Sequence, residues 1–216
     1  YENSMRKVYC MEKIILYIHG KGGNAAEAAR YQSIFSDCKV IGLDYTAQSP
    51  WEAREEFPAL FDAACGKSQS VEVIASSLGA FFTMCALGEK PIERAYFISP
   101  VVDMEKLISD MMTWANVTET ELCDKQEIQT DFGETLSWAY LCDVRARPIR
   151  WTVPTYILYG EKDNLISYET ISSFADETKA PLTVMKDGEH WFHTEEQMNF
   201  LDKWIEGCRT ASASNP

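Results

Sequence analysis

Six short apolar runs alternate with longer amphipathic stretches, and this alternation restricts the possible fold more than any other feature of the chain. The runs, which we expect to be strands, are residues 14–19, 39–44, 71–76, 95–99, 155–159 and 182–185. They are almost continuously apolar, as in strands that are covered on both faces. The expected helices are residues 25–35, 51–65, 78–87, 167–178 and 194–206. This order predicts an α/β fold: a doubly wound, mostly parallel six-stranded sheet flanked by helices.

The segment between the fourth and fifth expected strands interrupts this regular order. At 216 residues and 46% hydrophobic content, the chain predicts one domain, which we place at residues 11–209. Residues 101–154 are too many for one crossover connection. They contain helix-like stretches at 104–114, 119–127 and 134–141, with several aromatic side chains among them. The sequence therefore predicts a helical insertion within a single domain.

Charge and cysteine usage exclude several classes of function. The formal net charge is −13, which disfavours nucleic-acid binding because phosphate contacts need clustered lysine and arginine. The apolar run 14–18 is too short to span a bilayer, and charged residues at 12–13 interrupt the apolar run that a signal peptide needs.

The seven cysteines include no C-x-x-C pair. We expect mostly reduced thiols in a cytoplasmic protein, the alternative being one disulfide in an exported protein.

The third apolar run leads into a serine turn and then a helix-like stretch. A sharp strand–turn–helix of this kind strains its central residue and needs small residues two positions before and after it. With Ser77 at the centre, those positions are Ala75 and Gly79, and both are small. With Ser76 at the centre they would be isoleucine and leucine, which do not fit. The sequence therefore predicts Ser77 as an exposed nucleophile.

A serine nucleophile needs a base, and the chain offers three histidines. His190 lies in residues 188–192 (GEHWF), between the last expected strand and the last helix, on the edge where Ser77 is expected. His193 flanks the final helix, whose T-E-E-Q start at 194–197 is a capping box, and is expected to be a structural or rim residue. His19 is expected to brace the turn after the first strand. His190 is therefore the predicted base.

A carboxylate usually orients such a base. Asp163, in residues 159–163 (YGEKD), directly follows the fifth expected strand. One helix and one strand separate it from His190, so the two loops should be neighbours. Asp103 is the second candidate and Glu161 the third. The predicted order is serine, then Asp163, then His190, which is the order of one class of catalytic triad.

The glycine-rich turn at residues 19–23 (HGKGG) can approach a substrate closely through its backbone. A tetrahedral intermediate needs backbone N–H donors for its oxyanion. We expect Leu78 N–H and Lys21 N–H to supply them, with Gly22 N–H as the next candidate.

The glycine-rich turn at residues 19–23 matches neither the phosphate-binding loop nor the dinucleotide fingerprint, and the sequence has no His/Cys/Asp cluster with the spacing of metal ligands. The sequence therefore predicts no cofactor and no metal.

Four motifs in this order resemble the α/β-hydrolase superfamily of serine esterases and lipases: residues 19–23, 75–79, 159–163 and 188–192. The resemblance covers about residues 14–206, with alanine in place of the commonest first glycine of the serine motif. It implies an α/β-hydrolase fold with trimmed N-terminal strands, and a helical cap at 101–154. It also implies catalytic Ser77, Asp163 and His190.

The resulting functional hypothesis is a serine hydrolase that cleaves a carboxylic ester of a small or medium acyl group. The expected partner is a small-molecule ester, with no nucleic acid and no membrane span. A peptidase, thioesterase or acyltransferase could use the same residues, and a ligand-binding module without useful turnover is a further alternative. The aromatic residues of 101–154 suggest an apolar pocket.

Overall fold

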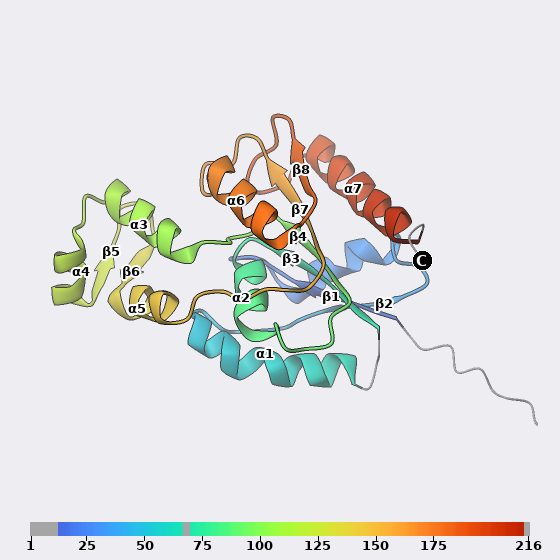
Figure 1. The fold of residues 1–216 in the computed structure, drawn as a ribbon, viewed down its shortest axis with the longest axis horizontal. Helices are drawn as coiled ribbons and strands as arrows, with labels where there is room; N and C mark the ends of the chain where they lie inside the picture. The colour runs from blue at the N-terminus through green and yellow to red at the C-terminus, as the bar shows by residue number, and fades with distance from the viewer. Residues whose placement is uncertain (1–12, 67–69, 214–216) are drawn as a thin grey trace, which may run out of the picture.

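A six-stranded parallel sheet forms the centre of the molecule (Figure 1). The computed structural model describes residues 13–66 and 70–213. The strands are β1 (Ile14–Ile18), β2 (Lys39–Gly42), β3 (Val71–Ser76), β4 (Arg94–Ile98), β7 (Thr155–Gly160) and β8 (Leu182–Met185). Their order is β2-β1-β3-β4-β7-β8, and every neighbouring pair is parallel. The predicted fold class is confirmed, and within the described residues no antiparallel strand joins this sheet.

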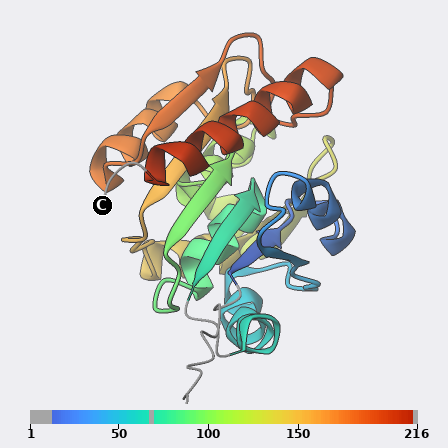
Figure 2. The ribbon, with the colours of Figure 1, turned by 90° about the vertical axis from the view of Figure 1, so that its right-hand side faces the viewer.

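Helices cover both faces of the sheet. On one face lie η1 (Ala25–Gln32) and α7 (Glu195–Ala213), as Figure 2 shows. On the other lie α1 (Pro50–Cys65), α2 (Leu78–Ala86) and α6 (Tyr168–Thr178). All five correspond to expected helices, although η1 is a 3₁₀ helix that ends before the predicted boundary. Covering on both sides explains why the strands are apolar without alternation.

The two faces build two separate hydrophobic cores, and β1 contributes to both. Ile14, Leu16 and Ile18 point toward α1 and α2, whereas Ile15 and Tyr17 point toward η1 and α7. This division follows from the two-residue period of a strand. The sheet is therefore fixed from both sides, and so are the loops that leave its carboxyl edge.

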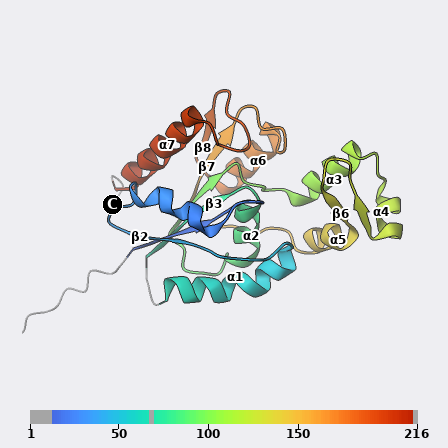
Figure 3. The same ribbon diagram turned by 180° about the vertical axis from the view of Figure 1, so that it is seen from behind.

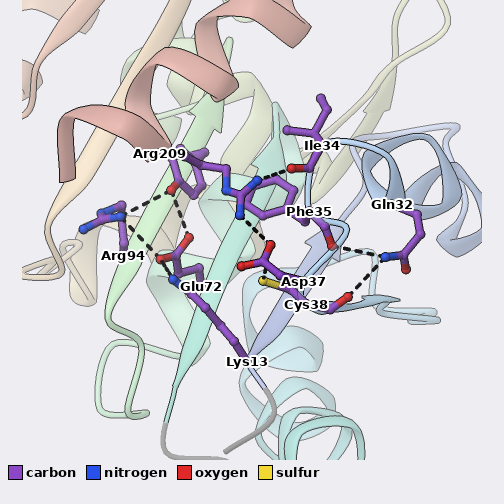
Figure 4. A network of polar contacts seen from close by, with 10 residues as sticks. Lys13, Gln32, Ile34, Phe35, Asp37, Cys38, Glu72, Arg94 and Arg209 are labelled. Atoms are coloured by element: carbon purple, nitrogen blue, oxygen red, sulfur yellow. Dashed lines mark hydrogen bonds and ion pairs between the residues drawn. The ribbon is translucent and has the colours of Figure 1, made fainter. Parts of the chain in front are cut away.

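A buried carboxylate organises the opposite, amino-terminal edge of the sheet (Figure 4). Glu72, on the central strand β3, is 2% exposed and accepts a hydrogen bond from the Tyr96 hydroxyl at 2.9 Å. Lys13 and Arg94 pair with its other oxygen at 2.5 and 3.3 Å. Because a buried charge must be compensated, we interpret this cluster as structural. It lies at the start of the strands, away from the loops that carry Ser77.

Residues 101–154, which we call the cap segment, project beyond the carboxyl ends of the strands (Figures 1 and 3). They form α3 (Met104–Trp114), α4 (Glu119–Lys125), the hairpin strands β5 (Glu127–Gln129) and β6 (Thr135–Ser137), and α5 (Trp138–Ala146). The helices predicted at 104–114 and 119–127 are present, the second ending at Lys125. Leu122, Leu136 and Leu141 are almost fully buried between these pieces.

The prediction of a helix at residues 134–141 is wrong for the first half of that range. Residues 135–137 pair instead with β5 as an antiparallel hairpin. Its turn is closed by mutual hydrogen bonds between Thr130 and Glu134, and Gly133 takes a φ of 87°, which favours glycine. The helix begins only at Trp138, after the Ser137 side chain caps it.

Candidate active site

Ser77 occupies the strained turn between β3 and α2. Its φ of 48° and ψ of −118° lie outside the region that side chains favour, so the surrounding structure must hold it there. Its N–H donates to the Ile98 carbonyl at 3.0 Å, and its own carbonyl accepts from Val101 N–H at 3.2 Å. These bonds tie the turn to the end of β4 and to the first residue of the cap segment.

The small residues around Ser77 are required by close backbone approach. A Cβ on Gly79 would lie 2.1 Å from the His19 carbonyl oxygen, closer than any side chain allows. A Cβ on Gly20 would lie 3.2 Å from Cβ of Ser77. The turn after β1 and the turn after β3 therefore pack against each other. Ser77 rather than Ser76 is at the centre of the turn, as the steric argument predicts.

The structure brings the three predicted catalytic side chains into one hydrogen-bonded line. Ser77 Oγ lies 2.8 Å from Nε2 of His190, and His190 Nδ1 lies 2.7 Å from Oδ2 of Asp163. Ser77 comes from the β3–α2 turn, Asp163 from the loop after β7, and His190 from the loop before α7. Parallel strands bring these loops to one edge of the sheet. A base that touches both a hydroxyl and a carboxylate has the geometry of nucleophile activation.

Asp163 is held firmly in its place. Its side chain is fully buried, and Oδ1 accepts from Leu165 N–H at 2.8 Å and from Ile166 N–H at 2.9 Å. This leaves Oδ2 for His190. The Tyr159 hydroxyl donates to the Ile166 carbonyl at 2.8 Å and fixes the same loop. Burial, and then the negative charge of Asp163, raise the pKa of Tyr159 to about 12.

The loop of His190 is pressed against the loop of Asp163. A Cβ on Gly160 would lie 2.5 Å from the Glu189 carbonyl oxygen, so only glycine fits between the two loops. On the far side, Thr194 caps α7 by accepting from Gln197 N–H at 3.2 Å. The Gln197 side chain accepts from His193 N–H at 3.0 Å, rather than completing the predicted capping box on Thr194.

The structure places the other candidate residues in different roles. Asp103 caps α3 by accepting from Lys106 N–H at 2.9 Å, and Glu161 accepts from the Asp187 N–H at 3.0 Å. His193 stacks on Trp191 and contacts its carbonyl. His19 stacks on Tyr45 at 4.2 Å and contacts the Gly20 carbonyl, as expected of a residue that braces the turn. None of these contacts reaches Ser77.

The expected oxyanion donors belong to two residues that line the cavity beside Ser77. Within the described residues, Leu78 N–H and Lys21 N–H donate no hydrogen bond to the protein, and both residues line the same cavity as Ser77. The turn that carries Lys21 is closed by Gly23 N–H donating to the Gly20 carbonyl at 3.1 Å. Unpaired N–H groups at a helix start and a glycine turn are suited to hold developing negative charge.

A cavity of about 540 Å³ opens beside Ser77 and extends under the cap segment. This volume lies within the range of small-molecule sites. Its lining comprises Lys21, Gln48, Ser77, Leu78, Val101, Met104, Leu107, Ile108, Met111, Trp114, residues 132–137, Tyr140 and Leu165. Lys21 Nζ forms an ion pair with Glu134, and both residues line the cavity, so the pair joins the glycine-rich turn to the hairpin.

The sequence did not identify most of the individual residues that line this cavity. The repeat of apolar residues along 104–114 was a usable signal, because it predicts one apolar face of a helix. Glu134 and Gln48 gave no signal, since a lone polar residue in a loop has no pattern.

Two further properties concern the described ranges. They contain no group of three or more His, Cys, Asp or Glu side chains able to hold a metal ion. None of their helices combines the length and apolarity needed to cross a bilayer. Within the described residues, Cys38, Cys65, Cys85, Cys123 and Cys142 form no disulfide, and Cys10 lies outside the described residues. Burial raises the pKa of Cys65 to about 11 and of Cys85 to about 12, which disfavours their thiolate forms.

No protein-family model matches the sequence, and no curated protein matches it significantly. Solved structures do match. Mouse alpha/beta hydrolase domain-containing protein 10 superposes with a TM-score of 0.73 at 16% identity, over 92% of this chain and 90% of its own. Est1E from Butyrivibrio proteoclasticus, with ferulic acid bound, superposes with a TM-score of 0.71 at 15% identity, over 97% of this chain and 93% of its own. The thioesterase domain from the curacin biosynthetic pathway superposes with a TM-score of 0.56 at 13% identity, over 90% of this chain and 91% of its own. Likeness at these identities establishes a shared fold.

Proposed function

Since the chain has the α/β-hydrolase fold, we propose that it is a serine hydrolase that cleaves a carboxylic ester of a small or medium acyl group. One observation carries this proposal: the unbroken line of hydrogen bonds from Ser77 through His190 to Asp163. The Ser77 end of this line lies beside a cavity large enough for a small molecule. No cofactor takes part in the proposed reaction.

The reaction proceeds through an acyl-enzyme. Ser77 Oγ attacks the ester carbonyl while His190 Nε2 takes its proton. Asp163 fixes the imidazole through Nδ1 and stabilises its positive charge. Leu78 N–H and Lys21 N–H donate to the oxyanion of the tetrahedral intermediate. His190 then returns the proton to the leaving alcohol, and a water molecule activated by the same base releases the acid.

Two neighbouring serines allow a matched test. We expect Ser77→Ala to lower kcat on p-nitrophenyl esters by at least about 10³-fold, since it removes the nucleophile. Ser76→Ala, one residue away on β3, should stay within a few-fold of the wild type. Equal activity of Ser77→Ala and wild type would exclude the mechanism.

A thioester is the second candidate substrate, because one structural neighbour is a thioesterase domain. The same residues could also act on aminoacyl amides or transfer the acyl group to another acceptor. A panel of esters, thioesters and amides with one common acyl group separates these activities. We expect the oxygen ester to give the highest kcat/KM. Tight ligand binding with background hydrolysis would instead support a binding module.

A further inference from the structure

We propose that the cavity beside Ser77 binds the acyl chain of the substrate and accepts an unbranched, uncharged chain of roughly ten to twelve carbons laid along α3. This inference rests on the proposed serine hydrolase function and specifies its substrate class. It follows from the direction, the length and the chemistry of the cavity.

The direction of the cavity assigns it to the acyl part of the substrate. Ser77, Leu78 and Lys21 line it, whereas His190 does not. The leaving alcohol must receive its proton from His190 Nε2, so it departs on the histidine side of Ser77. The group that stays bonded to Ser77 therefore extends into the cavity on the opposite side, beside the two N–H donors.

The length of the cavity follows α3. Its walls include Met104, Leu107, Ile108 and Met111, which repeat at the spacing of one helix face, and then Trp114. The Ser77 end is fixed, because Val101 N–H donates to the Ser77 carbonyl three residues before α3 begins. From Met104 to Trp114 the helix rises about 15 Å.

An alkyl chain of matching length can be calculated from bond geometry. An extended chain advances about 1.25 Å per carbon–carbon bond, so about 15 Å spans at most about twelve bonds, and a chain of roughly ten to twelve carbons fits within this length. A single aromatic ring would fill only the end nearest Ser77. The length of the α3 wall therefore favours a linear chain over an aryl acyl group.

The chemistry of the walls matches an uncharged chain. The α3 wall carries no charge, and its methionines can adapt their shape to a flexible ligand. Lys21 and Glu134 neutralise each other across the cavity. At the far end, Trp114 and Phe132 meet edge to face at 6.2 Å although they are 52% and 45% exposed. This pair offers apolar surface at the end of the cavity, and the end of a long chain would cover it.

The first test is a chain-length series. We expect kcat/KM on p-nitrophenyl esters to rise about two- to fourfold per methylene from butanoyl onward, since each buried methylene contributes transfer free energy. The rise should end at decanoyl or dodecanoyl. A maximum at acetyl, or a higher value for benzoyl than for decanoyl, would overturn the proposal.

Two variants test the wall itself. Met111→Trp should block the distal half, so the dodecanoyl-to-butanoyl ratio of kcat/KM falls at least tenfold. Trp114→Ala, at a half-exposed position that folding tolerates, should lower the same ratio about three- to tenfold. Ser109→Trp, on the exposed face of α3 outside the cavity, is the matched control and should keep the wild-type ratio. Equal loss on all chain lengths would contradict the proposal.

A binding measurement separates this inference from the proposed function. Ser77→Ala should bind decanoate more tightly than butanoate in calorimetry, and Met111→Trp in the same background should abolish that preference. If the chain-length preference holds in binding while the wild type hydrolyses no ester, the cavity assignment stands and the hydrolase function fails. If a serine-directed fluorophosphonate labels Ser77 but no chain-length preference exists, the function stands and this inference fails.

Discussion

The carboxyl edge of the sheet and the cap segment are built on different principles. At the sheet edge, backbone presses against backbone: a Cβ on Gly79 or Gly160 would lie 2.1 or 2.5 Å from a carbonyl oxygen. In the cap segment, side-chain contacts connect the helices to one another. Arg145 bridges Glu105 and Glu119 at 2.7 and 2.6 Å, which connects α5 to α3 and α4.

This difference indicates a division of labour. Contacts that leave no room for a side chain hold the loops of Ser77, Asp163 and His190 closely in place, as the proposed proton transfer requires. The ion pairs of Arg145 in the cap segment involve none of those three side chains. We therefore expect substitutions at the sheet edge to change catalysis on all substrates and substitutions in the cap to change the choice among them.

The largest effect should follow loss of the carboxylate behind His190. Asp163→Asn should lower kcat about 10³- to 10⁴-fold, because the imidazole loses its correct tautomer and the charge that stabilises it. Ester hydrolysis under saturating substrate measures this. Asp103→Asn is the matched control, since Asp103 only caps α3. Comparable losses in the two variants would show that Asp163 has been assigned the wrong role.

A glycine pair tests the backbone contacts at the sheet edge. Gly79→Ala should destabilise the protein by about 3 kcal/mol or more, because the new methyl group meets the His19 carbonyl. Gly207→Ala, in the middle of α7 with open space around it, should stabilise it by about 0.5–1 kcal/mol through helix propensity. Urea unfolding gives both values. A well-tolerated Gly79→Ala would mean that the two turns are not in contact.

A leucine pair tests whether the two regions open separately. Leu122 in the cap and Leu87 beside the sheet are both fully buried. Either substitution by alanine should cost about 2–4 kcal/mol. Native-state hydrogen exchange should rise only within residues 101–154 for Leu122→Ala, and across the sheet for Leu87→Ala. Faster exchange throughout the sheet in Leu122→Ala would show one cooperative unit instead of two.

The smallest effect concerns the ion pair between the regions. Lys21 and Glu134 are both more than a third exposed, so solvent screens their attraction to below about 1 kcal/mol. Glu134→Gln should change kcat/KM by about two- to threefold at low salt and less at high salt. A double-mutant cycle with Lys21→Met measures the coupling. A salt-independent change would assign Glu134 a role other than pairing.

Sequence alone predicted the sheet edge far better than the cap. The strands could be found because double-sided burial leaves continuous apolar runs, and Ser77 because the tight turn restricts residue size at Ala75 and Gly79. The order of residues along the chain favoured Asp163, and the structure adds that its second oxygen is occupied by two backbone N–H groups. These constraints are local, so the sequence displays them.

The cap resisted prediction because its contacts are long-range. The hairpin depends on a five-residue turn at 130–134 whose clearest local signal is Gly133. Helix propensity at 134–141 favoured the wrong structure. The pairing of Lys21 with Glu134 joins residues 113 positions apart. Neither residue has a neighbour in sequence that would indicate the other.

Covalent labelling of the wild type with a fluorophosphonate, followed by peptide mass spectrometry, identifies the nucleophile directly. We expect one modified residue, Ser77, with labelling lost in Ser77→Ala and slowed at least about 10²-fold in His190→Ala. Ser76→Ala should label at the wild-type rate. Modification of Ser76 or of any serine away from His190, or unchanged labelling of His190→Ala, would contradict this expectation.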